Sequence, residues 1–169
     1  METGIVSYGV ALPRHRISAQ ETWGVWKNMA TDLFDKMSIG ERAVLGPEED
    51  TLTLAVAAAK TALERSGVEK SRFGALLLGS GTSPYATKSA ATVMVDALGL
   101  PASMLVTDVQ CAEKSGSTAL LMAAALVETG QIDAALVVAA DTLNRHVSPG
   151  MVFEYVASAG AVAFVLGKQ

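Results

Sequence analysis

The sequence has little that suits a secreted, metal-binding or nucleic-acid-binding protein. Its single cysteine, Cys111, cannot form an internal disulfide, and two distant histidines, His15 and His146, make no cluster of metal ligands. The net charge is -4 and no basic run exceeds the triplet at 14–16, so the chain has no cationic face for nucleic acid. We therefore expect a cytoplasmic protein with no metal and no nucleic-acid partner.

Long hydrophobic runs are also absent, although the composition is apolar. No run of roughly eighteen apolar residues passes without a charge, glycine or proline, which argues against a membrane-spanning helix. The first residues lack the basic and apolar regions of a secretory signal. Charged residues nevertheless make up only 18% of the chain and hydrophobic ones 50%. We expect the excess apolar surface to be buried against another protein chain.

Apolar runs and helical patterns alternate along the chain, and we predict one domain over residues 1–169. Gly67 follows the second predicted helix, which Asp50 or Thr51 caps. Alternation of strands with helices of about ten or more residues predicts an α/β fold with a mixed, mostly parallel sheet and helices on both faces. The predicted strands are 5–12, 73–78, 104–109, 134–140 and 161–166; the predicted helices are 18–37 in two pieces, 51–66, 87–98 and 115–129; residues 38–50 are predicted as loop.

The predicted helix at 115–129 is apolar on all sides. Its only charged residue is Glu128. A helix that covers one face of a sheet keeps a polar outer stripe, whereas a helix that is apolar all round is buried all round. A single sheet with helices on both faces cannot bury this helix, so we expect a second layer of protein against its far side.

Several separate motifs resemble those of archaeal-type HMG-CoA synthases. They occur in the family's order and cover nearly the whole chain. The matching segments are Gly4-Ile5-Val6-Ser7-Tyr8-Gly9-Val10, Leu12-Pro13-Arg14-His15-Arg16-Ile17, Gly46-Pro47-Glu48-Glu49-Asp50-Thr51, Ser83-Pro84-Tyr85-Ala86-Thr87-Lys88, Ala140-Asp141-Thr142, Glu154-Tyr155 and Ala157-Ser158-Ala159-Gly160-Ala161-Val162-Ala163-Phe164. The chain thus resembles the N-terminal half of a thiolase-superfamily condensing enzyme.

This resemblance implies a thiolase-like fold. Such folds consist of two similar βαβαβαββ halves stacked in five layers, α-β-α-β-α, and this chain corresponds to the first half. A second half is then needed to complete the five layers. The apolar helix at 115–129 falls in the middle layer, in agreement with its composition.

The resemblance also implies the chemistry of a Claisen-type condensation. In such enzymes a cysteine thiolate takes up an acyl group as a thioester, because a thiol is both a good nucleophile and a good leaving group. A glutamate assists carbon–carbon bond formation, and a histidine of the C-terminal half orients the second substrate. Acyl-CoA is then the expected substrate, and no cofactor is implied.

The residues of this chain depart from that pattern at both positions that can be compared. The family segment Asp-Leu-Glu-Phe-Ala-Cys-Lys-Ala-Gly-Thr corresponds without a gap to residues 108–117, which places Glu113 at the cysteine position and Cys111 two residues early. The family's Gly-Ser-Glu-Ser motif corresponds to residues 79–82, which places Gly81 at the glutamate position. We therefore expect no acyl transfer by this chain alone.

Glu113 and Cys111 are the candidate catalytic residues, and each has a structural alternative. Glu113 is either a carboxylate base or anchor at the nucleophile position, or an acid that stabilises the first turn of a helix. Cys111 is either the nucleophile, if the local chain shifts by two residues, or a small buried thiol. We favour the structural interpretation for both residues.

Isolated polar residues give weaker signals. Lys88, Arg14 and Arg16 either contact the phosphates of CoA or are ordinary solvated side chains, and we favour the second interpretation. His15 and His146 lie in predicted polar loops, and we expect both to be exposed rather than catalytic.

Two functional hypotheses follow. In the first, a non-catalytic thiolase-like subunit pairs with another thiolase-fold chain, as a homo-oligomer or hetero-oligomer, in an acyl-CoA-processing complex that performs condensation or thiolysis. In the second, the chain is an active acyltransferase half-subunit that uses Glu113 or Cys111 together with a separate C-terminal-half chain. The resemblance also implies a small zinc-ribbon/OB-fold protein that helps to hold CoA as a further partner. We favour the first hypothesis.

Overall fold

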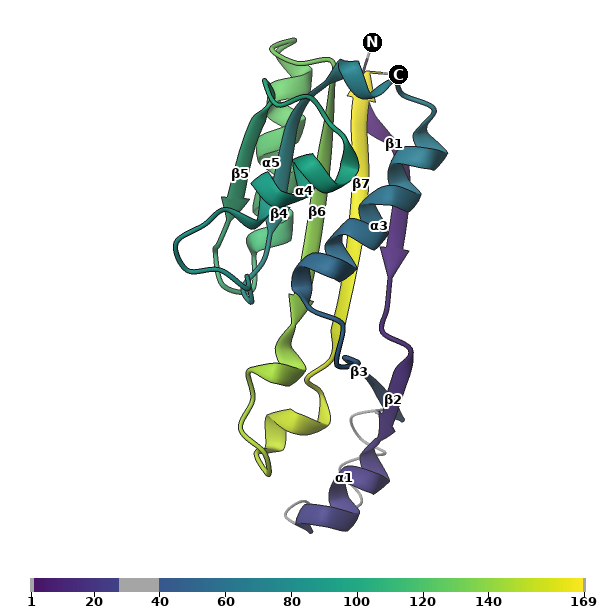
Figure 1. The fold of residues 1–169 in the computed structure, drawn as a ribbon, viewed down its shortest axis with the longest axis vertical. Coiled ribbons are helices and arrows are strands. Elements are labelled where there is room, and N and C mark those ends of the chain that lie inside the picture. Colours follow the sequence, from purple (N-terminus) through teal and green to yellow (C-terminus); the bar gives the residue numbers. More distant parts are fainter. Residues whose placement is uncertain (1, 28–39, 169) are drawn as a thin grey trace.

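Figure 1 shows the computed structural model of the chain, which describes residues 2–27 and 40–168. The main elements alternate as the sequence predicts, in the order βαβαβαββ. They are β1 (Thr3–Ala11), α3 (Thr51–Ser66), β4 (Phe73–Gly79), α4 (Ala90–Leu98), β5 (Leu105–Val109), α5 (Ser115–Glu128), β6 (Ala134–Thr142) and β7 (Ala159–Lys168). Short elements lie between them: β2 (His15–Ser18), α1 (Ala19–Trp26), β3 (Glu41–Val44) and the 3-10 turns η1 (Lys70–Arg72), η2 (Leu143–Arg145) and η3 (Val152–Tyr155).

The main sheet has five strands in the order β1-β7-β6-β4-β5. Strand β4 runs parallel to both β5 and β6, whereas β7 runs antiparallel to β6 and to β1. The parallel strands are joined by helices that cross over the sheet, and the antiparallel strands form its other edge. The mixed sheet with helices on both faces confirms the predicted fold class.

Strand β4 is buried on both faces because helices pack on each side of it. Leu76 and Leu78 contact the layer of α3 and α4, whereas Ala75 and Leu77 belong to the cluster beneath α5. Alternate side chains of a strand point to opposite faces, so a continuous apolar run is what this central position requires.

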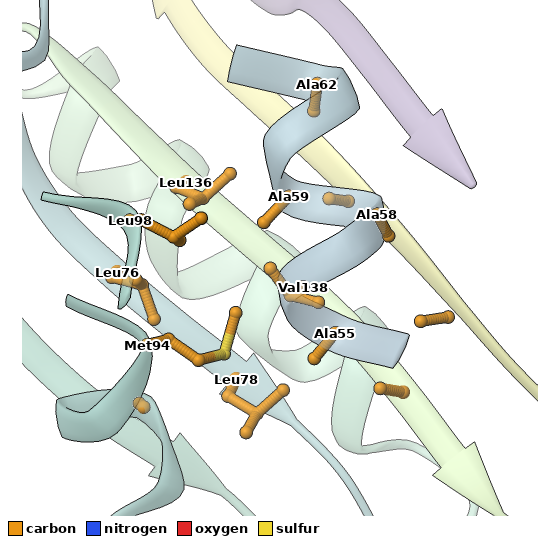
Figure 2. Close-up of a cluster of buried hydrophobic side chains, with 14 of the residues drawn as sticks. Ala55, Ala58, Ala59, Ala62, Leu76, Leu78, Met94, Leu98, Leu136 and Val138 are labelled. Atoms are coloured by element: carbon orange, nitrogen blue, oxygen red, sulfur yellow. The ribbon is translucent and has the colours of Figure 1, made fainter. Parts of the chain in front are cut away.

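Helix α3 approaches the sheet closely because its buried face carries alanines. Figure 2 shows Ala55 and Ala59 of α3 beside Leu136 and Val138 of β6. The helix begins after Asp50, whose side chain accepts a hydrogen bond from the Thr53 amide, and it ends at Gly67 in the left-handed conformation. Both ends lie where the sequence predicts them.

Helix α5 covers the opposite face of the sheet. Ala119, Ala123 and Val127 pack against strands of the main sheet and are fully buried. On the outer side of the helix, Leu121 is 73% exposed and Met122 is 44% exposed. The chain therefore buries only the sheet-facing side of this apolar helix. Separately, no helix among the described residues is both long and apolar enough to cross a bilayer.

Residues 41–44 correct the prediction of a continuous loop over 38–50. They form β3, which pairs with β2 in a small antiparallel sheet. Arg42 is buried and forms an ion pair with Glu154 at 3.2 Å, which ties this sheet to η3. The remainder of that loop and the second piece of the predicted helix at 18–37 fall partly at positions 28–39, outside the described residues.

The predicted helix at 87–98 begins later than expected, at Ala90. Ser89 caps it, and the Asp108 carboxylate accepts hydrogen bonds from the amides of Ala90 and Ala91, each at 2.8 Å. A carboxylate of β5 thus fixes the start of α4. The prediction missed this start because the contact comes from a different segment of the chain and leaves no signal in the sequence of the helix.

The close approach of β1 to α3 leads to a first prediction. A Cβ added at Gly9 would lie 2.7 Å from the Ala62 amide nitrogen and would also collide with the Ala58 carbonyl oxygen. We expect Gly9→Ala to destabilise the protein by about 3 kcal/mol, because backbone atoms cannot move aside as a side chain can. The measurement is the free energy of unfolding from denaturant titration.

The matched control is Gly24→Ala on α1, where a new Cβ would meet no atom within 4 Å. Replacing a helical glycine by alanine should leave stability unchanged or raise it by roughly 0.5–1 kcal/mol. Equal effects of the two substitutions would contradict the packing of β1 against α3.

Candidate functional site

A cavity of about 260 Å³ lies where three parallel strands end. It is lined by residues that follow β4, that precede α5 and that stand at the end of β6: Gly81, Thr82, Ala112, Glu113, Asp141 and Leu143. Parallel strands bring their carboxyl ends to the same edge of the sheet, which is where α/β proteins place their ligand sites. We refer to this cavity as the Glu113 pocket. It unites the two positions, 113 and 81, that the sequence marks as altered.

Glu113 lies in the turn between β5 and α5. Helix α5 starts at Ser115 with Lys114 as its N-cap residue, so Glu113 stands just outside the helix and not in its first turn as predicted. The Ser115 hydroxyl holds the turn: it donates to the Ala112 carbonyl oxygen at 2.9 Å and accepts from the Cys111 amide at 3.0 Å. The Glu113 side chain is exposed and lines the pocket.

Ala112 adopts a left-handed backbone conformation that makes this turn tight. Its φ is 48°, in the left-handed region that costs a non-glycine residue on the order of 1–2 kcal/mol. Such conformations persist where the surrounding structure holds them, and they concentrate at functional sites. The consequence here is that the chain reverses from strand to helix within a few residues and presents Glu113 at the pocket.

Cys111 is exposed, which makes the prediction of a buried thiol wrong. The prediction rested on the usual burial of free cysteines, but β5 ends at Val109 and Cys111 already belongs to the exposed turn. Its side chain is not among those that line the Glu113 pocket. Of the two candidate catalytic residues, the structure therefore brings only Glu113 together with Gly81.

Gly81 leaves the pocket open, although neither its backbone conformation nor its neighbours require a glycine at this position. A Cβ added there would lie 3.5 Å from the Ala112 carbonyl oxygen and 3.7 Å from Asp141 Oδ1, both ordinary contact distances. Gly79 differs, because a Cβ there would lie 2.6 Å from backbone atoms of Ser115 and Gly116. The space for a larger side chain at position 81 is thus retained, while the close packing of the loop on α5 depends on Gly79.

Asp141 is a pocket residue that the sequence reasoning did not identify as functional. Its Oδ1 accepts hydrogen bonds from the amides of Gly81, at 2.9 Å, and Thr82, at 3.0 Å. The available signal was an acidic residue directly after the apolar run of β6, at the carboxyl end of a parallel strand. The pocket consequently has two carboxylates, Glu113 and Asp141, beside the apolar side chains of Ala112 and Leu143.

The other candidate residues lie away from this pocket. Lys88 stacks over the Tyr85 ring, 4.1 Å from its centroid, at a second cavity of about 410 Å³. Arg16 donates to the backbone carbonyl oxygens of Pro13 and His15, and Arg14 is exposed. His15 and His146 are exposed, as predicted, but His15 lies in β2 and not in a loop. Within residues 2–27 and 40–168, no group of three or more His, Cys, Asp and Glu side chains could hold a metal ion.

Comparisons with known proteins agree with the resemblance of the sequence. A profile of the family described as thiolase, N-terminal domain, matches residues 37–150. The hydroxymethylglutaryl-CoA synthase of Pyrobaculum arsenaticum is 37% identical over 169 residues, which are 100% of this chain and 48% of that protein. The protein of the same name from Methanosarcina barkeri is 39% identical over 169 residues, or 48% of its length. The chain spans about half the length of these curated relatives.

Solved structures share the fold. The 3-oxoacyl-[acyl-carrier-protein] synthase III of Aquifex aeolicus superposes with a TM-score of 0.91 at 22% identity, covering 99% of this chain and 54% of that one. OleA of Xanthomonas campestris gives a TM-score of 0.84 at 23% identity, covering 99% of this chain and 57% of that one. The predicted thiolase-like fold is confirmed, and again the match ends at about half of each larger protein.

Proposed function

The chain belongs to the family of thiolase N-terminal domains, and we propose that it is a thiolase-fold subunit that pairs with another thiolase-fold chain in an acyl-CoA-processing complex. In this proposal the chain completes the fold of its partner and does not carry the acyl group itself. The observation that supports the pairing is a set of exposed apolar side chains on one side of the main sheet.

This apolar face consists of the outer side of α5 and the uncovered side of β1. Ser7 of β1 points to α3, where its hydroxyl donates to the Ala62 carbonyl oxygen at 2.7 Å. Side chains alternate along a strand, so Tyr8 and Val10 leave β1 on the opposite face, on which α5 lies. The guanidinium of Arg65 on α3 nevertheless lies over the Tyr8 ring, 5.6 Å from its centroid. Tyr8 is 56% exposed and Val10 is 52% exposed, and Leu121 of α5 is 73% exposed.

Exposure of such a face is unfavourable in water. Full burial of a leucine-sized side chain contributes about 1.5–3 kcal/mol, and this face presents several large apolar side chains together. Exposed apolar side chains gathered on one face are typical of protein interfaces. Another thiolase-fold unit is the occupant we propose, because this chain covers only about half of the relatives and structures that share its fold.

The composition of the Glu113 pocket supports a non-catalytic role. Covalent acyl transfer requires a nucleophile that is also a good leaving group, and a carboxylate would form an anhydride that water hydrolyses readily. Glu113 stands where the resemblance places the thiol, and Gly81 where it places the glutamate. Acyl-CoA chemistry in the complex would then be performed by residues of the partner, with a zinc-ribbon/OB-fold protein as a further expected component.

One observation favours the alternative of an active half-subunit. Glu113 is exposed toward a pocket that also contains Asp141, so a carboxylate is available to remove a proton there. In that alternative a separate chain supplies the C-terminal half, and Glu113 or Cys111 takes part in the reaction.

Pairing through the apolar face predicts that Leu121→Asp prevents assembly. A charge placed at the centre of an apolar interface must be desolvated without a partner, so we expect at least about a hundredfold weaker association. The measurement is purification of the tagged chain from its native host, with identification of the retained chains by mass spectrometry. Wild-type protein should retain a thiolase-fold chain, and Leu121→Asp should not.

Val25→Asp is the matched control, because Val25 is 70% exposed on α1, away from the apolar face. This variant should retain the same thiolase-fold chain as the wild type. Loss of that chain in both variants, or its retention in both, would contradict pairing through α5 and β1.

The non-catalytic role predicts that Glu113→Gln and Cys111→Ser each change the turnover of the assembled complex by less than about threefold. Loss of a general base would instead lower turnover by roughly 10²–10⁴-fold. Incubation of the complex with radiolabelled acetyl-CoA should also leave no stable label on this chain. Label on the wild type that disappears in Cys111→Ser, or a large loss of turnover in Glu113→Gln, would establish the alternative.

A further inference from the structure

One carboxylate oxygen holds the loop that lines the Glu113 pocket. Asp141 Oδ1 accepts from the Gly81 amide at 2.9 Å, the Thr82 amide at 3.0 Å, the Thr82 hydroxyl at 2.8 Å and the Ser80 hydroxyl at 3.2 Å. Four donors from three consecutive residues thus converge on one atom. Hydrogen bonds to an ionised acceptor are the stronger ones, so this atom dominates the attachment of the loop.

A buried hydroxyl network extends this attachment into the fold. The Thr142 amide donates to the Thr82 hydroxyl at 2.9 Å, and Thr51 at the start of α3 donates to the Thr82 carbonyl oxygen at 2.8 Å. The hydroxyls of Thr51 and Thr142 lie 2.7 Å apart. The end of β6 and the start of α3 therefore both brace the loop. Among the described residues, Asp141 is the one that accepts from the Gly81 amide near the start of this loop.

The position of Gly81 is the consequence that matters for the pocket. A glycine has wide backbone freedom, and this one is exposed and has no Cβ to pack against its neighbours. Its amide is fixed by Asp141 Oδ1, and the Ala112 carbonyl oxygen lies on the other side of the space that a Cβ would occupy. A loop without this attachment could move into the pocket or away from it.

We propose that Asp141 is a positioning residue of the Glu113 pocket: its carboxylate fixes Gly81 opposite Ala112 and Glu113 and so sets the shape of the cavity. This role deepens the proposed function, since it concerns the same pocket of the thiolase-fold subunit. It does not depend on whether Glu113 is catalytic, and it can be measured without turnover.

The experiment measures hydrogen exchange of individual amides by NMR in Asp141→Ala. It uses the full chain together with any chain that accompanies it on purification. We expect the Gly81 amide to exchange at least about tenfold faster than in the wild type, because it loses its acceptor. The Thr82 amide also donates to the Ser80 hydroxyl at 3.1 Å, so its exchange should accelerate less. Gly81 is exposed, so water replaces the lost bond and the fold as a whole stays intact. Asp141→Asn keeps a carbonyl oxygen at the same place but loses the charge, so exchange of its Gly81 amide should lie between that of the wild type and that of Asp141→Ala.

Asp108→Ala is the matched control. The Asp108 carboxylate also accepts from two backbone amides, those of Ala90 and Ala91, but it lies outside the Glu113 pocket. This variant should accelerate exchange at Ala90 and Ala91 and leave Gly81 and Thr82 unchanged. Asp141→Ala should show the reverse pattern, which a general loss of stability would not produce.

Cys111 supplies a second, spectroscopic readout. It is the only cysteine of the sequence, and it is exposed. It follows Val109, whose carbonyl oxygen accepts from the Ser80 amide at 3.1 Å, and it directly precedes Ala112. A fluorine tag on this thiol should change its NMR signal in Asp141→Ala.

Unchanged exchange at Gly81 and Thr82 in Asp141→Ala, or equal acceleration in Asp108→Ala, would overturn the positioning role. Failure of the pairing proposal would leave both readouts as they are, because neither requires a partner or a substrate. The two proposals are therefore tested separately.

Discussion

Packing of α5 against the sheet is the constraint on which the rest of the structure depends. Strand β4 is apolar on both faces, so a helix must lie on each side of it, and α5 supplies the layer opposite α3 and α4. The same helix is apolar on its outer side, where Leu121 remains exposed. The inner side of α5 thus buries β4, and its outer side leaves Leu121 exposed. The α5 layer is therefore covered by protein on its sheet-facing side only. The proposed pairing supplies the missing contact.

The start of α5 also determines the pocket. Gly79 packs directly on the backbone of Ser115 and Gly116, and the turn through Ala112 places Glu113 beside the loop that follows β4. The scaffold of this site is therefore well fixed, with a left-handed turn on one side and a carboxylate-held loop on the other. The side chains at positions 113 and 81 are what separate this pocket from the thiol and glutamate that the family resemblance implies. A retained scaffold with altered side chains is consistent with a subunit that binds or braces rather than one that carries the acyl group.

Much of this could be predicted where local sequence signals are strong. Asp50 and Gly67 fixed the ends of α3, and the uninterrupted apolar run of β4 indicated its burial on both faces, because these features depend on neighbouring residues. Strand β3 was missed because four residues that include Glu41 and Arg42 show no clear period and pair with a distant segment. The exposure of Cys111 depends on where β5 ends, and the role of Asp141 depends on which loop lies next to the end of β6. Both are tertiary details that the local sequence does not indicate. The resemblance brought positions 113 and 81 together, whereas the contacts of Asp141 appear only in three dimensions.

The central claim is that the apolar face of α5 and β1 is covered by another thiolase-fold unit. Native mass spectrometry of the untagged protein isolated from its own cells tests this most directly, combined with sedimentation of the same sample at micromolar concentration. We predict a defined complex in which this chain is bound to a second copy or to a different thiolase-fold chain, with no free folded monomer. A compact monomer that unfolds in a single cooperative transition would contradict the claim, because such a protein would be stable with Leu121 and Tyr8 exposed to water.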